Sequence, residues 1–149
     1  MNQADIKSAN KAKFDAVKAL SLPLGHYAIT SSGPMGARGL RAIGDADVVV
    51  DDELWRHLED QYGVKEDQGV TKINLHSDLV EILGEGSFFK SGGREPGEPT
   101  VEDQIRGADI IDGLPFVKLE HVLYFKQRMG RAKDKKDIEL IEEYMRKHG

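Results

Sequence analysis

Two short segments of the chain carry the residue types that could do metal and phosphate chemistry. The first holds Asp45 and Asp47, which stand two residues apart and run into three consecutive valines at positions 48–50. In an extended chain, side chains at i and i+2 project from the same side, so both carboxylates can hold one or two divalent cations together. Carboxylate oxygens are hard ligands that suit Mg²⁺ or Mn²⁺. The pair therefore predicts a metal site at a strand end.

The second segment is a turn rich in serine and glycine. It holds Ser31, Ser32 and Gly33, which follow a β-prone segment, and eleven residues separate it from the carboxylates. Backbone N–H groups and hydroxyls at the start of a helix stabilise a bound phosphate. A phosphate-binding turn and a carboxylate pair at adjoining strand ends predict a metal–nucleotide site.

A third acid and a basic C-terminal segment add to this pattern. Glu81 lies between Val80 and Ile82 in a predicted strand, where an ionised group costs free energy unless something uses it. Residues 118–149 carry nine Lys/Arg against six Asp/Glu, a net charge of +3, whereas the whole chain carries −5. An acidic body with a basic tail segment suits a metal held by carboxylates and a polyanion held by lysines and arginines.

Composition excludes several classes of protein. The chain of 149 residues has no cysteine, which removes thiolate zinc sites, thiol nucleophiles and disulfide scaffolds. Its longest uncharged stretch contains Pro23 and Pro34 and is no membrane span. The first residues include an acid and no apolar run, so no signal peptide is expected. The net charge disfavours duplex DNA or RNA binding as the main activity. We expect a cytoplasmic protein with no membrane contact.

The elements that must position these residues alternate between helix and strand. The N-terminal segment 1–20 is predicted to form a helix over residues 3–20, and a short helix is predicted within 31–44. Further helices are predicted over 51–62, 100–107, 119–129 and 134–147. Strands are predicted over 27–30, 48–50, 70–75, 79–83 and 110–111. Residues 84–99 are predicted to form a flexible loop that could act as a lid. The pattern favours a single α/β (α+β) domain, residues 1–149, with a mixed sheet flanked by helices. Its core sheet and active-site motif fall in residues 26–83, and a basic helix pair falls in 119–147.

Two segments resemble a known family. The first, TSSGPMGARGLRAIGDADVVVD, is similar to the signature of the nucleotidyltransferase superfamily related to DNA polymerase β. That signature is a strand, a Gly-Ser or Gly-Gly turn, a short helix and a hydrophobic-flanked Asp-x-Asp, with a third acid on a later strand. The second, LEHVLYFKQRMGRAKDKKDIELIEEY, resembles a helix pair of nucleotidyltransferase-like proteins, including those of toxin–antitoxin and abortive-infection systems. The likeness is closest to the small single-domain members.

The resemblance implies a fold, a reaction and a set of site residues. The reaction is Mg²⁺-dependent (or Mn²⁺-dependent) transfer of a nucleoside monophosphate from an NTP to a hydroxyl of a small molecule, an RNA end or a protein. Two ions would be held by three catalytic acids, Asp45, Asp47 and Glu81. The phosphates would be bound by the turn and by basic side chains, namely Ser31, Ser32, Gly33, Arg38, Arg41, Lys126, Arg131 and Lys133. Asp134 is instead predicted to cap the last helix.

Other interpretations of these residues stay open. The main alternative is a non-catalytic nucleotide-binding or protein-interaction module, such as a toxin–antitoxin component, that keeps the fold. Ser31 stands where the family commonly has glycine, and this departure from the signature favours the non-catalytic module. Haloacid-dehalogenase-type phosphatases and glycosyltransferases also use Asp-x-Asp, but the former place it after a hydrophobic strand and the latter have longer chains. A chain of this size leaves little room for an acceptor domain, so a second copy or a protein partner is expected to complete the site.

Overall fold

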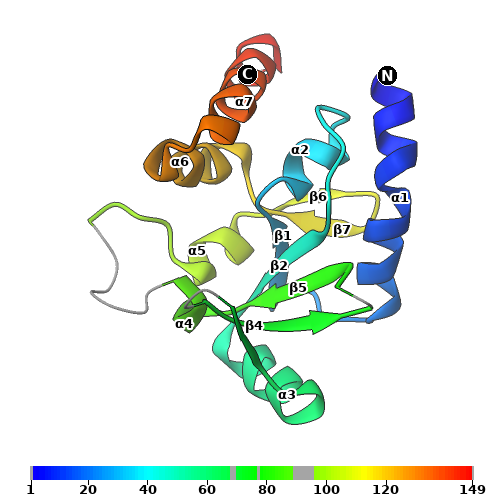
Figure 1. Cartoon of the computed structure of the whole chain (residues 1–149), viewed down its shortest axis with the longest axis vertical. Helices are drawn as coiled ribbons and strands as arrows, with labels where there is room; N and C mark the ends of the chain where they lie inside the picture. Colours follow the sequence, from blue (N-terminus) through cyan, green and yellow to red (C-terminus); the bar gives the residue numbers. More distant parts are fainter. Residues whose placement is uncertain (1, 68–69, 77, 89–95, 149) are drawn as a thin grey trace.

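The computed structural model describes residues 2–67, 70–76, 78–88 and 96–148 (Figure 1). The helices are α1 (Gln3–Ala19), α2 (Gly33–Ala37), α3 (Asp52–Tyr62), α4 (Glu85–Phe88), α5 (Val101–Arg106), α6 (Leu119–Met129) and α7 (Ala132–His148). The strands are β1 (Tyr27–Thr30), β2 (Ala46–Val50), β3 (Lys65–Asp67), β4 (Val70–Leu75), β5 (Val80–Leu83), β6 (Asp109–Ile111) and β7 (Leu114–Phe116).

The described strands form one mixed sheet of seven, in the order β3-β4-β5-β2-β1-β7-β6. The pairs β2–β5 and β1–β7 are parallel, and the other neighbouring pairs are antiparallel. Helices flank the sheet, so the predicted α/β class with a mixed sheet is confirmed. None of the helices in the described part of the chain is long and apolar enough to cross a membrane.

Three elements were not predicted from the sequence. The strands β3 and β7 have three residues each, and β3 is entirely charged while β7 has Pro115 at its centre. Pairing with β4 and β1 makes them strands, and such pairing leaves little trace in local sequence. The short helix α4 occupies part of the predicted loop 84–99. Residues 89–95 of that loop lie outside the described residues.

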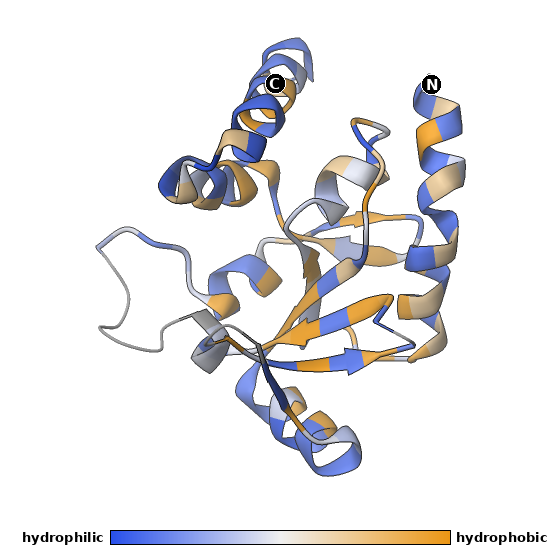
Figure 2. Ribbon diagram, in the orientation of Figure 1, coloured by the Kyte–Doolittle hydropathy of each residue, from blue (hydrophilic) through white to orange (hydrophobic). Residues whose placement is uncertain are grey.

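Each face of the sheet buries its own apolar cluster. Ile29 and Val48 belong to the cluster that also contains Val17 of α1 and Leu54 of α3. The neighbouring residues of the same strands point the other way. Val49, for example, belongs to the cluster that also contains residues of α5, α6 and α7. Figure 2 shows hydrophobic colour concentrated in the sheet and interrupted by hydrophilic residues on β2, β4 and β5.

These interruptions fall side by side because of the strand register. Thr30 of β1 pairs with Asp47 of β2, Asp47 pairs with Glu81 of β5, and Glu81 pairs with Asn74 of β4. Residues in register point to the same face of a sheet. The four side chains therefore form a row, called here the polar row, on the face that α5, α6 and α7 cover.

A buried amide fixes the connection between α2 and β2. Asn10 of α1 is fully buried. Its Nδ2 donates to the carbonyls of Gly36 at 3.3 Å and Arg41 at 3.0 Å, and its Oδ1 accepts from the backbone N–H of Ile43 at 2.9 Å. A Cβ added at Gly36 would lie 2.8 Å from Asn10 Nδ2, so a glycine is needed there. These three hydrogen bonds fix the positions of Arg41 and of the residues that lead into β2.

Candidate functional site

Three carboxylates gather at the polar row. Asp47 and Glu81 are cross-strand neighbours on β2 and β5, and Asp45 directly precedes β2. One carboxylate oxygen from each lies within 4.8 Å of the others. These three residues, called the acid triad, are the ones that the sequence singled out as metal ligands. Three ionised carboxylates this close repel one another, and a nearby positive charge would stabilise them.

The environment of Asp47 makes its ionised form costly without a cation. Burial raises the pKa of Asp47 to about 8, and the charges of Asp45 and Glu81 push in the same direction; a hydrogen bond with Ser31 opposes them. Burial, followed by the charge of Glu81, also raises the pKa of Asp45. The Oδ1 atom of Asp47 is buried and accepts no hydrogen bond from the described residues. Buried carboxylate oxygens normally have a partner, and a divalent cation fits this one.

The turn after β1 brings serine hydroxyls to the same place. Ser31 has a positive φ of 57°, which is uncommon for a residue other than glycine, and both Ser31 and Ser32 line a cavity next to the acid triad. Gly33 lies behind them and is not a lining residue: a Cβ there would meet Ile29 Cγ2 at 2.3 Å. Packing therefore explains the glycine. Because α2 has only five residues, a phosphate here would depend mainly on side chains rather than on a helix dipole.

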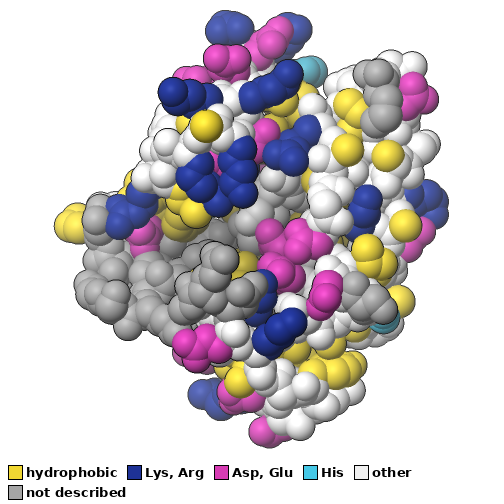
Figure 3. Space-filling model, in the orientation of Figure 1, with side chains coloured by type: hydrophobic (Ala, Val, Ile, Leu, Met, Phe, Trp, Pro, Cys, Tyr) yellow, Lys and Arg dark blue, Asp and Glu magenta, His cyan; other side chains and the backbone are white. Residues whose placement is uncertain are grey.

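The cavity lies between two members of the acid triad, Asp45 and Asp47, and the basic C-terminal helices. Its volume is about 470 Å³, and its opposite side carries four cationic residues, called here the basic wall: Arg41, Lys126, Arg131 and Lys133. Figure 3 shows acidic side chains at the centre of this face, with Lys and Arg side chains gathered above them over α6 and α7. The structure thus brings together residues that lie about 90 positions apart in the sequence.

Two buried acids hold the basic wall in place. Asp137 accepts from Arg41 Nη1 at 2.8 Å and from Lys126 Nζ at 2.9 Å. Asp134 accepts from the side chain of Arg131 at 2.7 Å and from its backbone N–H at 3.1 Å. These bonds hold the pKa of Asp134 below its ordinary value. Asp134 is not the N-cap that was predicted, because α7 begins at Ala132; it caps the helix from inside the first turn.

Two other predicted phosphate ligands differ in their surroundings. Arg38 does not line the cavity: its guanidinium contacts Asp109 at 3.0 Å and the carbonyl of Pro34 at 2.8 Å, which ties α2 to β6. Lys133 lies at the cavity, is exposed, and forms no ion pair with the residues that the structure describes. Lys133 is thus the member of the basic wall whose charge is most available to a ligand.

Sequence reasoning missed two features of the site. Lys72 of β4 contacts Glu81 Oε1 at 2.7 Å. Val122, Phe125 and Met129 of α6 line the cavity next to Lys126 and form an apolar strip. The spacing of the α6 residues by three and four positions could have identified that face. Only the register of the β4–β5 hairpin, which no local motif specifies, brings Lys72 to Glu81.

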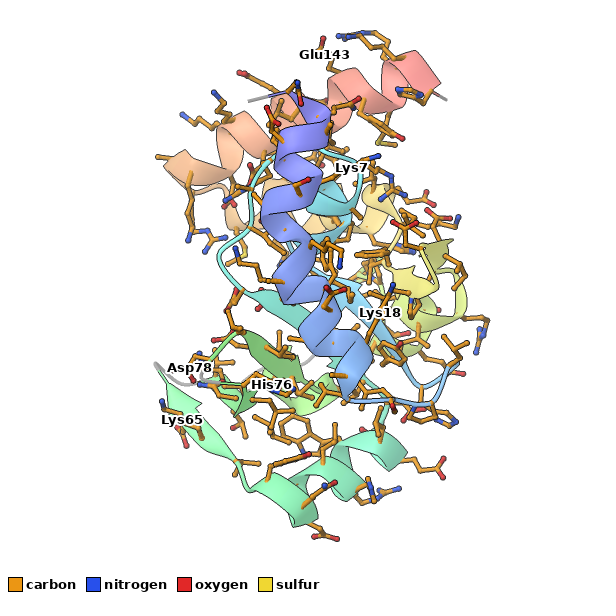
Figure 4. The ribbon with its side chains drawn as sticks, turned by 90° about the vertical axis from the view of Figure 1, so that its right-hand side faces the viewer. Lys7, Lys18, Lys65, His76, Asp78 and Glu143 are labelled. Atoms are coloured by element: carbon orange, nitrogen blue, oxygen red, sulfur yellow. The ribbon has the colours of Figure 1, made fainter. Side chains whose placement is uncertain are left out.

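Divalent cations are expected to raise the melting temperature of the protein. A cation at the acid triad relieves the repulsion among three carboxylates and binds only the folded state. For a chain of this size, each 1 kcal/mol of stabilisation corresponds to roughly 2–4 °C. Asp47→Asn should abolish the rise, as measured by calorimetry with Mg²⁺ or Mn²⁺ and with EDTA. Asp78→Asn, an exposed acid in the β4–β5 turn (Figure 4), should retain it. Equal melting temperatures of the wild type with metal and with EDTA would contradict the site.

The metal-free protein is expected to lose stability as the pH rises. Asp47 titrates at about 8 in the folded state against an ordinary value of 3.8, so the folded state retains a proton that the unfolded state has lost. This contribution is fully present below pH 3.8, declines as the pH rises, and is gone above about 8. In Asp47→Asn the same decline should be absent. Urea denaturation in EDTA between pH 5 and pH 9 measures the difference, and parallel curves for the two proteins would refute it.

Comparisons of the chain with models of protein families, with curated proteins and with solved structures find no match.

Proposed function

We propose that the chain is a nucleotidyltransferase that transfers a nucleoside monophosphate from an NTP to a hydroxyl acceptor, and that its sheet is the nucleotidyltransferase fold. One observation carries the proposal: Asp45 and Asp47 of the acid triad line the same cavity of about 470 Å³ as the basic wall, and Glu81 lies beside these two acids. That volume falls within the range of small-molecule sites. Acids alone would fit a cation site and bases alone would fit an anion site; the two together fit a metal-bound polyphosphate.

The acid triad suits Mg²⁺ or Mn²⁺. Its oxygens are hard ligands, they lie within 4.8 Å of one another, and Asp47 Oδ1 is buried without a hydrogen-bond partner among the described residues. Cations bound there would neutralise charge on the triphosphate and lower the pKa of an attacking hydroxyl. By the resemblance, two ions take part when the nucleotide is present.

The basic wall would hold the polyphosphate and the leaving group. Lys133 would offer a point charge, and Arg131, whose Nε and Nη2 are paired with Asp134, would offer its remaining guanidinium N–H groups to phosphate oxygens. Ser31 and Ser32 offer hydroxyls on the side nearest the acid triad. Since Asp134 and Asp137 already orient three of the four cations, the wall is ordered before the ligand arrives. Such order lowers the reorganisation that binding requires.

The reaction would be an in-line displacement at the α-phosphorus. The acceptor oxygen forms a new bond to that phosphorus, the bond to the oxygen that bridges to the β-phosphorus breaks, and pyrophosphate leaves. The hydroxyl proton passes to a carboxylate of the acid triad or to water. Positioning and charge neutralisation provide most of the acceleration in this kind of chemistry.

The apolar strip of α6 provides a surface for the flat part of a ligand. Phe125 and Met129 would contact a flat, weakly polar group such as a nucleotide base. A second copy or a protein partner would supply further acceptor contacts, and a cytoplasmic location would supply NTP and Mg²⁺.

NTP binding tests the proposal directly. Calorimetry with each of the four NTPs should show binding that needs Mg²⁺, vanishes in EDTA and is lost in the double variant Asp45→Ala/Asp47→Ala, because the metal links the triphosphate to the triad. The Asp78→Asn variant serves as the control for loss of an acid. Absence of binding to all four NTPs would refute the proposal and favour the protein-interaction module.

Lys133 should contribute to affinity without contributing to stability. Lys133→Met is expected to weaken NTP binding about five-fold, since one exposed charge near a phosphate contributes about 1 kcal/mol. Its melting temperature should equal that of the wild type. Lys136→Met is the matched control, because Lys136 is exposed on the same helix but does not line the cavity. Equal losses of affinity in the two variants would indicate a general charge effect and contradict the assignment.

A further inference from the structure

The acid triad already has one counter-cation of its own. Lys72 Nζ lies 2.7 Å from Glu81 Oε1, and the two side chains are only 13% and 21% exposed. Lys72 stands two residues before Asn74 on β4, so its side chain leaves the sheet on the same face as the polar row. Its ammonium therefore reaches the triad from the sheet, whereas the basic wall faces the triad across the cavity.

Three of the four cations of the basic wall are paired with other acids, and the fourth is exposed. Arg41 and Lys126 contact Asp137, Arg131 contacts Asp134, and Lys133 is exposed on α7. Among the residues that the structure describes, Lys72 is thus the cation that forms an ion pair with a carboxylate of the acid triad. Three carboxylates are balanced by one ammonium and one divalent cation together. A second divalent cation would have to displace Lys72 from Glu81 and would leave the cluster with excess positive charge.

We propose that Lys72 takes the place of one divalent cation in the nucleotide-free site, so that the acid triad binds a single divalent ion at Asp45 and Asp47 while Lys72 holds Glu81. The inference rests on the proposed function for the identity of the site. It adds a positioning residue and a limit on metal occupancy that the resemblance does not imply.

The proposal is tested by counting Mn²⁺ ions bound without nucleotide, with electron paramagnetic resonance of free Mn²⁺ on the full chain. The wild type should bind one equivalent. Lys72→Met should bind a second equivalent or bind the first at least about ten-fold more tightly, because an adjacent positive charge has been removed. Lys72→Arg, which keeps the charge, should behave as the wild type.

Lys65→Met is the matched control. Lys65 lies directly opposite Lys72 on the neighbouring strand β3, at the edge of the sheet, and is exposed (Figure 4). The same loss of charge one strand farther from Glu81 should leave both the stoichiometry and the affinity unchanged. Circular dichroism on each variant establishes that it is folded, and the wild-type count stands even if Lys72→Met does not fold.

The outcomes separate the two proposals. Two tight equivalents in the wild type, or one equivalent of unchanged affinity in folded Lys72→Met, would overturn the role of Lys72 and leave the metal–nucleotide site intact. Equal effects of Lys65→Met and Lys72→Met would also overturn it. Absence of Mn²⁺ binding in every variant would overturn this inference and the metal site of the proposed function together.

Discussion

The repulsion among three carboxylates on one face of an apolar sheet is the constraint that the rest of the site must satisfy. Asp45, Asp47 and Glu81 lie close together where water is partly excluded, so their charges interact more strongly than on an open surface. Four cationic residues stand across the cavity and would be drawn to them. Asp134 and Asp137 prevent this, because they hold three of those cations on the helix side. The cavity therefore separates the acids from the basic wall, because the ion pairs with Asp134 and Asp137 keep three of the cations away from the acids.

The backbone that supports the triad is fixed by ordinary packing and hydrogen bonding. The strand register aligns Asp47 with Glu81, and Asn10 holds the connection that leads into β2. Gly33 and Gly36 are needed for close approach to Ile29 and Asn10 rather than for contact with a ligand. A motif can therefore contain glycines that serve the fold while its serines and acids serve the site.

Sequence was enough to predict the features that have a local pattern. The valine run after Asp47 predicted β2, and apolar spacing predicted α6 with its observed bounds. The candidate metal ligands were found because three acids stood next to buried strands, and the structure brings all three together. That they bind metal stays a prediction.

What the sequence did not reveal depends on contacts between distant segments. β3 and β7 exist because β4 and β1 pair with them, and Arg38 points to Asp109 because β6 lies beside α2. The position of Lys72 follows from hairpin register, in which a shift of one residue would turn its side chain to the opposite face. The resemblance assigned Arg38 to the phosphates from its place in the motif, and its ion pair with Asp109 lies away from the cavity.

Asp137 joins two parts of the chain that are far apart in sequence, since one carboxylate receives both Arg41 from the segment before β2 and Lys126 from α6. Loss of that carboxylate alone would strand Lys126 as a buried charge without its closest partner, which is a severe defect. Replacement of Lys126 or Arg41 alone would remove only one of its two partners. The shared carboxylate makes the cluster asymmetric: when either base is replaced the other keeps Asp137, whereas replacement of Asp137 deprives both bases of the same partner.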